Sequence, residues 1–60
     1  MIKVQLMSNA KCVDGTHVPF RFYENDVYIV TKTHKTYIIR CKNYEVEVPH
    51  EAIKTKIMKS

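Results

Sequence analysis

The side chains of this sequence best suited to metal binding or thiol chemistry are its cysteines and histidines: Cys12, His17, His34, Cys41 and His50. Structural zinc sites are built from close ligand pairs such as C-x2-C or H-x3-H, which form a chelating turn. Here successive candidates lie five, seventeen, seven and nine positions apart, so the sequence contains no such pair. We therefore predict that the chain binds no metal ion and needs no cofactor.

The two cysteines are even in number, so a disulfide has to be weighed against free thiols. The first residues, MIKVQ, alternate in polarity and do not form the apolar segment of a secretory signal. Without such a signal we expect a cytoplasmic protein. Disulfides are rare in reducing compartments, so we expect Cys12 and Cys41 to be reduced and partly buried. The longest apolar run, 27–30, has four residues against the roughly 20 of a membrane span, so we expect no membrane partner.

No arrangement in the sequence is typical of an enzyme. Cys12, Asp14 and His34 supply the residue types of a nucleophile, an orienting carboxylate and a base, but nothing in their order ties them to one site. The single glycine cannot form a glycine-rich phosphate-binding loop. Glu45 and Glu47 fit a solvated strand face better than a catalytic carboxylate pair. We predict a protein without catalytic activity.

The apolar residues are biased toward those that favour a pleated sheet. Val, Ile, Phe, Tyr and Thr account for 24 of the 60 residues, whereas Ala and Leu together account for three. A chain of this length has room for one small hydrophobic core. The composition therefore predicts an all-β fold with a single domain over residues 1–60.

Hydrophobic alternation and turn residues divide the chain into short elements. We expect strands over 2–7, 27–31, 36–41 and 44–48, a loop over 8–17, an extended arm over 18–23 and a hairpin connection over 32–35. The segment 27–31 is apolar on both faces, which predicts the most buried strand. Two structures fit the end of the chain: a 3₁₀ turn over 49–53 followed by a strand over 54–58, which we favour, or a C-terminal α-helix that would make the fold α+β.

This order of elements resembles the SH3-like (Src-homology-3-like) small β-barrel. Residues 22–30, FYENDVYIV, are similar to the diverging-turn segment of that family, in which an aromatic residue precedes a short turn, an acidic residue and an apolar strand. Residues 48–53, VPHEAI, are similar to its Val-Pro-x-x-x-Val segment, which carries the 3₁₀ turn. The resemblance implies a five-stranded barrel with a 3₁₀ turn before the last strand.

The sequence departs from the branch of that family that binds Pro-rich peptides. Those ligands lie between aromatic side chains of the first loop, a Trp on the hairpin and a Tyr in the 3₁₀ turn. Here the first strand continues into MSNA, there is no Trp, and Ala52 occupies the position of the Tyr. Of that groove only Pro49 is present, so we expect no Pro-rich peptide ligand.

The charge of the chain is concentrated in its second half. Residues 1–30 sum to zero, and residues 31–60 carry seven cations against three carboxylates, which is the entire net charge of +4. Residues with AT-rich codons number 26, against seven for Gly, Ala, Pro and Arg together, so an AT-rich genome accounts for part of the lysine content. The net charge alone is therefore weak support for nucleic-acid binding.

The basic hairpin is the predicted site of interaction with another protein. Alternation places Ile38 and Arg40 on the solvent face of their strand, opposite Ile39, with Tyr28 and Tyr37 close by. Exposed Ile, Tyr and Arg side chains are typical of protein interfaces. We therefore predict a stand-alone regulator or inhibitor that docks onto a larger protein through one face of the barrel. The predicted contact residues are Tyr28, Tyr37, Ile38 and Arg40.

Nucleic-acid binding is the alternative function of the same hairpin. Its cations would contact phosphates while a tyrosine stacks on a base. The residues expected to do so are Lys32, His34, Lys35, Arg40 and Lys42. A third interpretation is a solvated face whose lysines keep the protein soluble.

Overall fold

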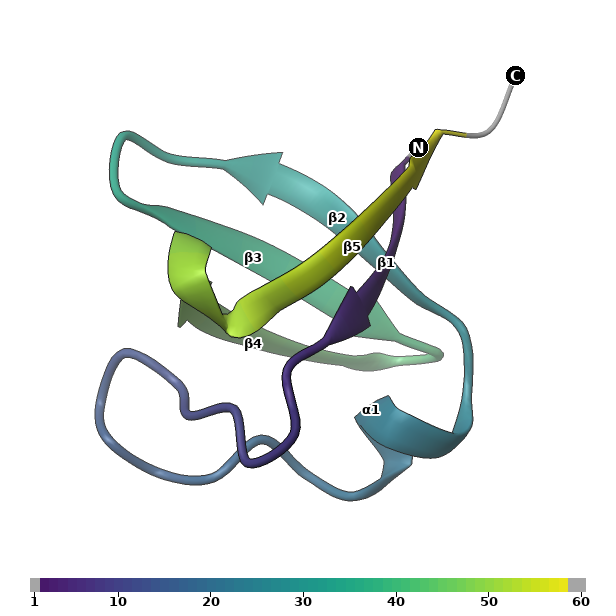
Figure 1. Cartoon of the computed structure of the whole chain (residues 1–60), viewed down its shortest axis with the longest axis horizontal. Helices are drawn as coiled ribbons and strands as arrows, with labels where there is room; N and C mark the ends of the chain where they lie inside the picture. The colour runs from purple at the N-terminus through teal and green to yellow at the C-terminus, as the bar shows by residue number, and fades with distance from the viewer. Residues whose placement is uncertain (1, 59–60) are drawn as a thin grey trace.

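Five strands and two short helical turns make up the protein in a computed structural model that describes residues 2–58 (Figure 1). In chain order they are β1 (Ile2–Leu6), α1 (Arg21–Glu24), β2 (Val27–Lys32), β3 (Thr36–Cys41), β4 (Tyr44–Pro49), a 3₁₀ turn (His50–Ala52) and β5 (Ile53–Met58). Within these residues no helix is long and apolar enough to cross a membrane.

The strands form one antiparallel sheet in the order β4-β3-β2-β1-β5. Hairpins join β2 to β3 and β3 to β4, whereas β5 follows the 3₁₀ turn and pairs with β1, so that Ile2 lies opposite Met58. The all-β class and the 3₁₀ turn before the last strand are confirmed. The alternative of a C-terminal α-helix is wrong, because residues 53–58 are extended and pair with β1.

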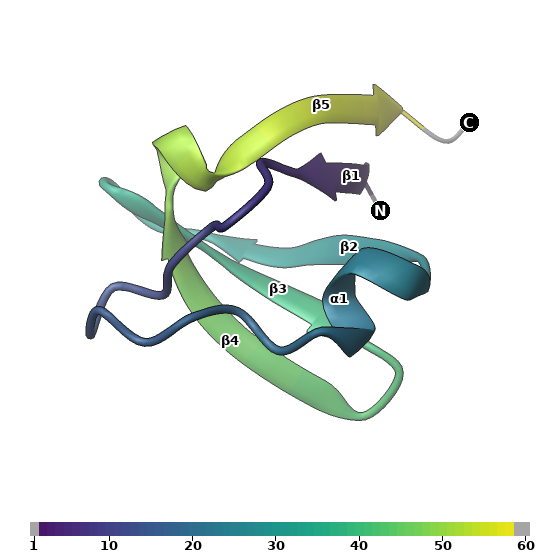
Figure 2. The same ribbon diagram turned by 60° about the horizontal axis from the view of Figure 1, so that its bottom comes forward.

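One face of the sheet carries the hydrophobic core. The buried residues are Val4, Leu6, Ala10, Val18, Phe22, Val27, Tyr37, Ile39, Cys41, Val48 and Ala52. Three of them, Ala10, Val18 and Phe22, come from the long segment between β1 and β2, which lies with α1 along one side of the sheet (Figure 2). This segment therefore helps to cover the inner face of the sheet.

The most buried strand is β3 rather than β2. The inward residues of β3 are all buried, whereas β2 contributes only Val27 to the fully buried set. The prediction that 27–31 is the most buried strand is wrong, because only one face of β2 packs against the core. The apolar residues Tyr28, Ile29 and Val30 of β2 are half-buried. A register shift after Ile29 also interrupts the pairing of β2 with β3.

The extended arm predicted over 18–23 ends in the helical turn α1 instead. The N–H of Phe22 donates to the carbonyl of Pro19 at 3.0 Å, and the N–H of Tyr23 donates to that of Phe20 at 2.9 Å. Proline suits this place because its fixed φ is compatible with the first turn of a helix. The turn directs Phe22 into the core at 2% exposure and leaves Phe20 and Tyr23 outside.

Backbone hydrogen bonds fasten the long segment 7–20 to the rest of the fold. The N–H of Met7 donates to the carbonyl of Ala52 at 2.9 Å, and the N–H of Val13 donates to that of Glu47 at 3.0 Å. The first bond ties the segment to the 3₁₀ turn, and the second ties it to the outer edge of β4. The segment is therefore part of the folded domain, although between Met7 and Phe20 its only strand-like pairing is an isolated β-bridge between Lys11 and His17.

The turn between β3 and β4 contains a residue whose conformation favours glycine. Lys42 has φ of 57°, where the Cβ of an L-residue crowds the following carbonyl at a cost of roughly 1–2 kcal/mol. Glycine avoids that crowding but loses more backbone entropy on folding. We expect Lys42→Gly to raise the free energy of unfolding by about 0.5–1 kcal/mol, measured by urea denaturation. Lys42→Ala removes the same charge, keeps the Cβ and should give no such gain; equal stability of the two variants would contradict this account.

Candidate protein-docking surface

Three of the four residues predicted to contact a protein lie together on the outer face of the sheet. Tyr28 of β2 and Arg40 of β3 are cross-strand neighbours, and Ile38 lies two residues from Arg40 on the same face. Arg40 is exposed, whereas Tyr28 and Ile38 are half-buried. The predicted alternation of β3 is confirmed, since Ile39 on the opposite face is fully buried.

Tyr37, the fourth predicted residue, is not on this face. It is 4% exposed, and its ring centroid lies 4.3 Å from that of His50. Its hydroxyl accepts a hydrogen bond from Nζ of Lys56 at 2.5 Å. The prediction of Tyr37 as an exposed contact is wrong, because the alternation that turns Ile39 inward turns Tyr37 inward as well.

Two cations of the outer face, Arg40 and Lys3, are paired with carboxylates within the fold. Arg40 pairs with Glu45, its cross-strand neighbour on β4, with Nε 2.8 Å from Oε2 and Nη2 in contact with the same oxygen. Lys3 pairs with Asp26 at 3.0 Å, and the hydrogen bond and charge of this carboxylate raise the pKa of Lys3. Exposed pairs contribute little to stability. They do reduce the unmatched charge that this face offers to a partner.

The five residues predicted to bind nucleic acid do not form one continuous stripe. Three of them flank or form the β2–β3 connection: Lys32, His34 and Lys35. Lys42 lies in the turn at the other end of β3, a strand length of roughly 17–20 Å away. Arg40 lies between the two groups but is paired with Glu45. A nucleic-acid backbone following these residues would therefore meet a carboxylate on its path.

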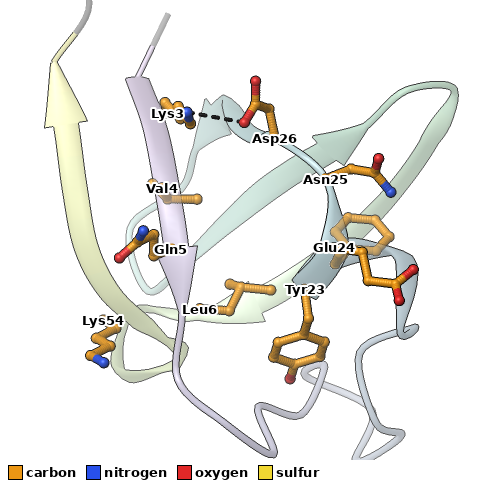
Figure 3. A pocket seen from close by; sticks show the side chains of 10 residues that line it. Lys3, Val4, Gln5, Leu6, Tyr23, Glu24, Asn25, Asp26 and Lys54 are labelled. Carbon is orange, nitrogen blue, oxygen red and sulfur yellow. Dashed lines mark ion pairs between the residues drawn. The ribbon is translucent and has the colours of Figure 1, made fainter.

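A polar cleft opens beside β1, where β1 and β2 diverge (Figure 3). β1 pairs with β2 only from Ile2 to Val4, and the cleft of about 370 Å³ lies between the remainder of β1 and the segment leading from α1 into β2. The Lys3–Asp26 ion pair spans it, as the dashed line in Figure 3 shows, while the side chain of Glu24 points away from β1. Lys54 also lines the cleft and forms no salt bridge within the described residues, so only part of the charge in this polar hollow is paired.

The most exposed aromatic side chain of the described residues lies beside α1. Phe20 is 72% exposed, and the neighbouring Tyr23 is 39% exposed. Both line a shallow, mainly apolar hollow of about 420 Å³, and none of its lining residues is a carboxylate. We call the residues of this hollow the loop-side surface: Ser8, Asn9, His17, Val18, Phe20 and Tyr23.

A cation–π pair adds a second aromatic group next to α1. The guanidinium carbon of Arg21, which follows Phe20 in the chain, lies 3.7 Å from the ring centroid of Tyr44. The carbonyl of Arg21 accepts a hydrogen bond from Sγ of Cys41 at 3.4 Å, which ties α1 to the end of β3. Phe, Tyr and Arg side chains, the types enriched in protein interfaces, thus gather around α1.

The loop-side surface was not predicted from the sequence, although a signal for it is present. Residues 20–23 read FRFY, with aromatic residues at positions 20, 22 and 23. Phe22 and Tyr23 are consecutive, and consecutive side chains of an extended chain point to opposite faces. An extended arm with one buried face can therefore bury only one of the two. The pattern therefore indicates that part of this aromatic group remains in water.

Both cysteines are free thiols, with Cys41 buried and Cys12 half-buried. The inward position of Cys41, predicted from the alternation of its strand, is confirmed. Within residues 2–58 no three His, Cys, Asp or Glu side chains come together as a metal site would require.

Comparison with known proteins does not assign the chain to a family. No protein-family model, no curated protein and no solved structure matches it. The candidate surface is therefore defined by the contacts and exposures of its own residues.

The hydroxyl of Tyr23 holds the loop-side surface in place. It accepts a hydrogen bond at 2.9 Å from the N–H of Ala10, which also contacts the carbonyl of Met7 at 3.2 Å. Tyr23→Phe removes one acceptor of a buried donor, and we expect it to lower the free energy of unfolding by about 0.5–1.5 kcal/mol. Hydrogen exchange at the Ala10 amide should become faster. Tyr44→Phe, which keeps the ring beneath Arg21, is the control; an equal effect of the two variants would exclude this role of Tyr23.

Asp14 gives the loop an acid-sensitive turn. Its carboxylate accepts hydrogen bonds from the hydroxyl of Thr16 at 2.6 Å and from the N–H of Thr16 at 3.0 Å, and these bonds lower the pKa of Asp14. A lowered pKa in the folded state means that the stabilisation is present above about pH 4 and is lost as the pH falls through the pKa of the folded protein.

We therefore expect Thr16→Ala to raise the pKa of Asp14 toward its ordinary value. An NMR titration of the Asp14 side-chain carbonyl carbon measures this directly. Thr16→Ser keeps the hydroxyl, and its pKa should stay close to that of the unmodified protein. If alanine and serine leave the pKa equally low, the Thr16 hydroxyl does not cause the shift.

Proposed function

We propose that this chain is an SH3-like small β-barrel that acts by binding a larger protein through its loop-side surface. The strand order β4-β3-β2-β1-β5, the long segment between β1 and β2, and the 3₁₀ turn between β4 and β5 support the barrel assignment. The segments 22–30 and 48–53, which carry the resemblance in sequence, lie at the α1–β2 junction and at the 3₁₀ turn.

The exposure of Phe20 is the observation that carries the proposal. Burial of a phenylalanine side chain contributes about 1.5–3 kcal/mol, and the domain itself uses little of this at 72% exposure. A rigid aromatic side chain beside an apolar hollow is the type of residue that dominates binding energy in protein interfaces. The docking surface we propose is therefore centred on Phe20 and Tyr23 rather than on Tyr28, Ile38 and Arg40.

The size and chemistry of the domain favour regulation by binding over catalysis. The loop-side surface offers aromatic and amide side chains and one histidine, and a domain of this size has room for one standard interface of about 800 Å² per partner or for a few smaller ones. A regulator or inhibitor that occupies a site on its partner needs only such a binding surface. The free thiols of Cys12 and Cys41 support a cytoplasmic location, where thiols stay reduced.

The proposal can be tested by site-specific photo-crosslinking. We would place benzoylphenylalanine at position 20, or at position 38 for comparison, and irradiate the purified protein in an extract of the source cells. We expect one discrete protein adduct from position 20. Adduct formation from position 38 alone would return the interface to the sheet face, and adducts sensitive to nuclease would favour nucleic acid as the partner.

Competition separates specific docking from accidental capture. Excess unmodified protein should suppress the adduct, and Phe20→Ser should compete at least about tenfold less well, which corresponds to roughly 1.4 kcal/mol. Val13→Ser is the matched control, because Val13 is 52% exposed but does not line the hollow, and it should compete normally. Both substitutions are at exposed sites, so each should change the free energy of unfolding by no more than about 0.5 kcal/mol. Equal competition by the two variants would refute the role of Phe20.

A further inference from the structure

β5 forms one edge of the sheet and is paired on one side only. The sheet order ends with β5, which pairs with β1 over residues 53–58 with a register shift at Lys54, and in the views of Figures 1 and 2 no other strand runs along its far side. Alternate residues of an edge strand direct their N–H and C=O groups away from the neighbouring strand. The outer side of β5 is therefore a row of backbone groups that can accept another strand.

The opposite edge of the sheet is not equivalent to β5. β4 forms that edge, and the loop between β1 and α1 lies against it, with the N–H of Val13 donating to the carbonyl of Glu47 at 3.0 Å. The protein's own chain thus occupies part of the β4 edge. Among the described residues, β5 presents the more open edge.

The side chains of β5 give its edge a positive charge. Residues 53–58 contain Lys54 and Lys56 and no carboxylate, and neither lysine forms a salt bridge within the described residues. Nζ of Lys56 donates to the hydroxyl of Tyr37 at 2.5 Å and lies 4.8 Å from the centroid of its ring, and neither contact is with a carboxylate. Ile57, which follows Lys56 in β5, is 40% exposed and offers an apolar side chain to a partner.

These lysines oppose the pairing of β5 with a second copy of itself. An antiparallel pair centred on Thr55 would place Lys54 opposite the other copy's Lys56, and a pair centred on Lys56 would place the two Lys56 residues opposite each other. Like charges directly opposite destabilise a strand pair, and edge lysines are a common protection against such pairing. The same charges would stabilise a strand that carries carboxylates at the facing positions.

We propose that the edge of β5 binds an extended acidic segment of a partner protein, which adds to the sheet as a further strand. Backbone hydrogen bonds to β5 supply the affinity, and carboxylates opposite Lys54 and Lys56 select the segment. This site is separate from the loop-side surface, on which the proposed function depends. Either one can fail while the other stands.

A pair of short synthetic peptides tests the proposal on the full chain. In one, Glu and Val alternate; in the other, Lys replaces Glu. We expect the Glu peptide to shift the amide resonances of residues 53–58 and to slow their hydrogen exchange by about tenfold or more, with affinity that falls as salt is added. The Lys peptide should do neither. A Glu peptide with N-methyl groups on alternate amides keeps its charges but cannot form the strand pair, and it should not protect β5.

Charge reversal at one exposed lysine provides the matched variants. Lys54→Glu should weaken binding of the Glu peptide by about tenfold and allow binding of the Lys peptide, because facing charges are exchanged. Lys35→Glu makes the same change in net charge at the β2–β3 connection and should leave the affinity within about twofold. Phe20→Ser should have no effect, which distinguishes this site from the loop-side surface.

Three results would overturn the proposal. The first is a Glu peptide that leaves the exchange of residues 53–58 unchanged. The second is equal binding by the N-methylated peptide, which would mean that charge alone attracts it. The third is an equal loss of affinity in Lys35→Glu and Lys54→Glu, which would mean that net charge and not the β5 edge is recognised.

Discussion

Burial of the single inner face of the sheet is the constraint on which the rest of this structure depends. A domain of this size has one small core, and the chain between β1 and β2 helps to cover it by contributing Ala10, Val18 and Phe22. The same segment is irregular, so its backbone groups need partners outside a regular ladder. Bonds to the 3₁₀ turn, to the edge of β4 and to the hydroxyl of Tyr23 supply them. Fold and candidate surface therefore depend on one segment.

The exposed aromatic group follows from this arrangement. The helical turn α1 is short, and it can direct one of its aromatic residues inward; Phe22 takes that place. Phe20 and Tyr23 then lie on the outside of the cover, where Tyr23 uses its hydroxyl for the loop and Phe20 has no comparable bond among the described contacts. A chain selected for stability alone would favour a polar residue at a position as exposed as that of Phe20. This makes the aromatic group informative about binding rather than about folding.

The strands of the hairpins and the last strand were predictable from the sequence, because alternation and turn residues act over neighbouring positions. β3 has the predicted bounds, and the outward orientation of Arg40 and Ile38 follows from the same alternation.

The helical turn α1 was not predictable from alternation, since Phe20 and Phe22 also alternate as they would in a strand. The burial of β2 and the pairing of Arg40 with Glu45 depend on which strands become neighbours, which is a property of the whole sheet. The predicted surface was therefore correct in orientation for most of its residues and incomplete in its chemistry.

The magnitudes of the available interactions decide which part of the molecule can supply affinity. On the outer face, Arg40 and Lys3 already have carboxylate partners, and a new partner would have to replace exposed pairs worth about 0.2–1 kcal/mol each. At the loop-side surface, a partner that buries Phe20 gains about 1.5–3 kcal/mol from one side chain and breaks no internal contact to do so. At β5 the gain comes from several backbone hydrogen bonds of about 0.5–1.5 kcal/mol each, and it requires a partner segment that is already extended. A rigid apolar side chain favours a folded partner, whereas an open strand edge favours a flexible one, so the two surfaces suit different kinds of partner.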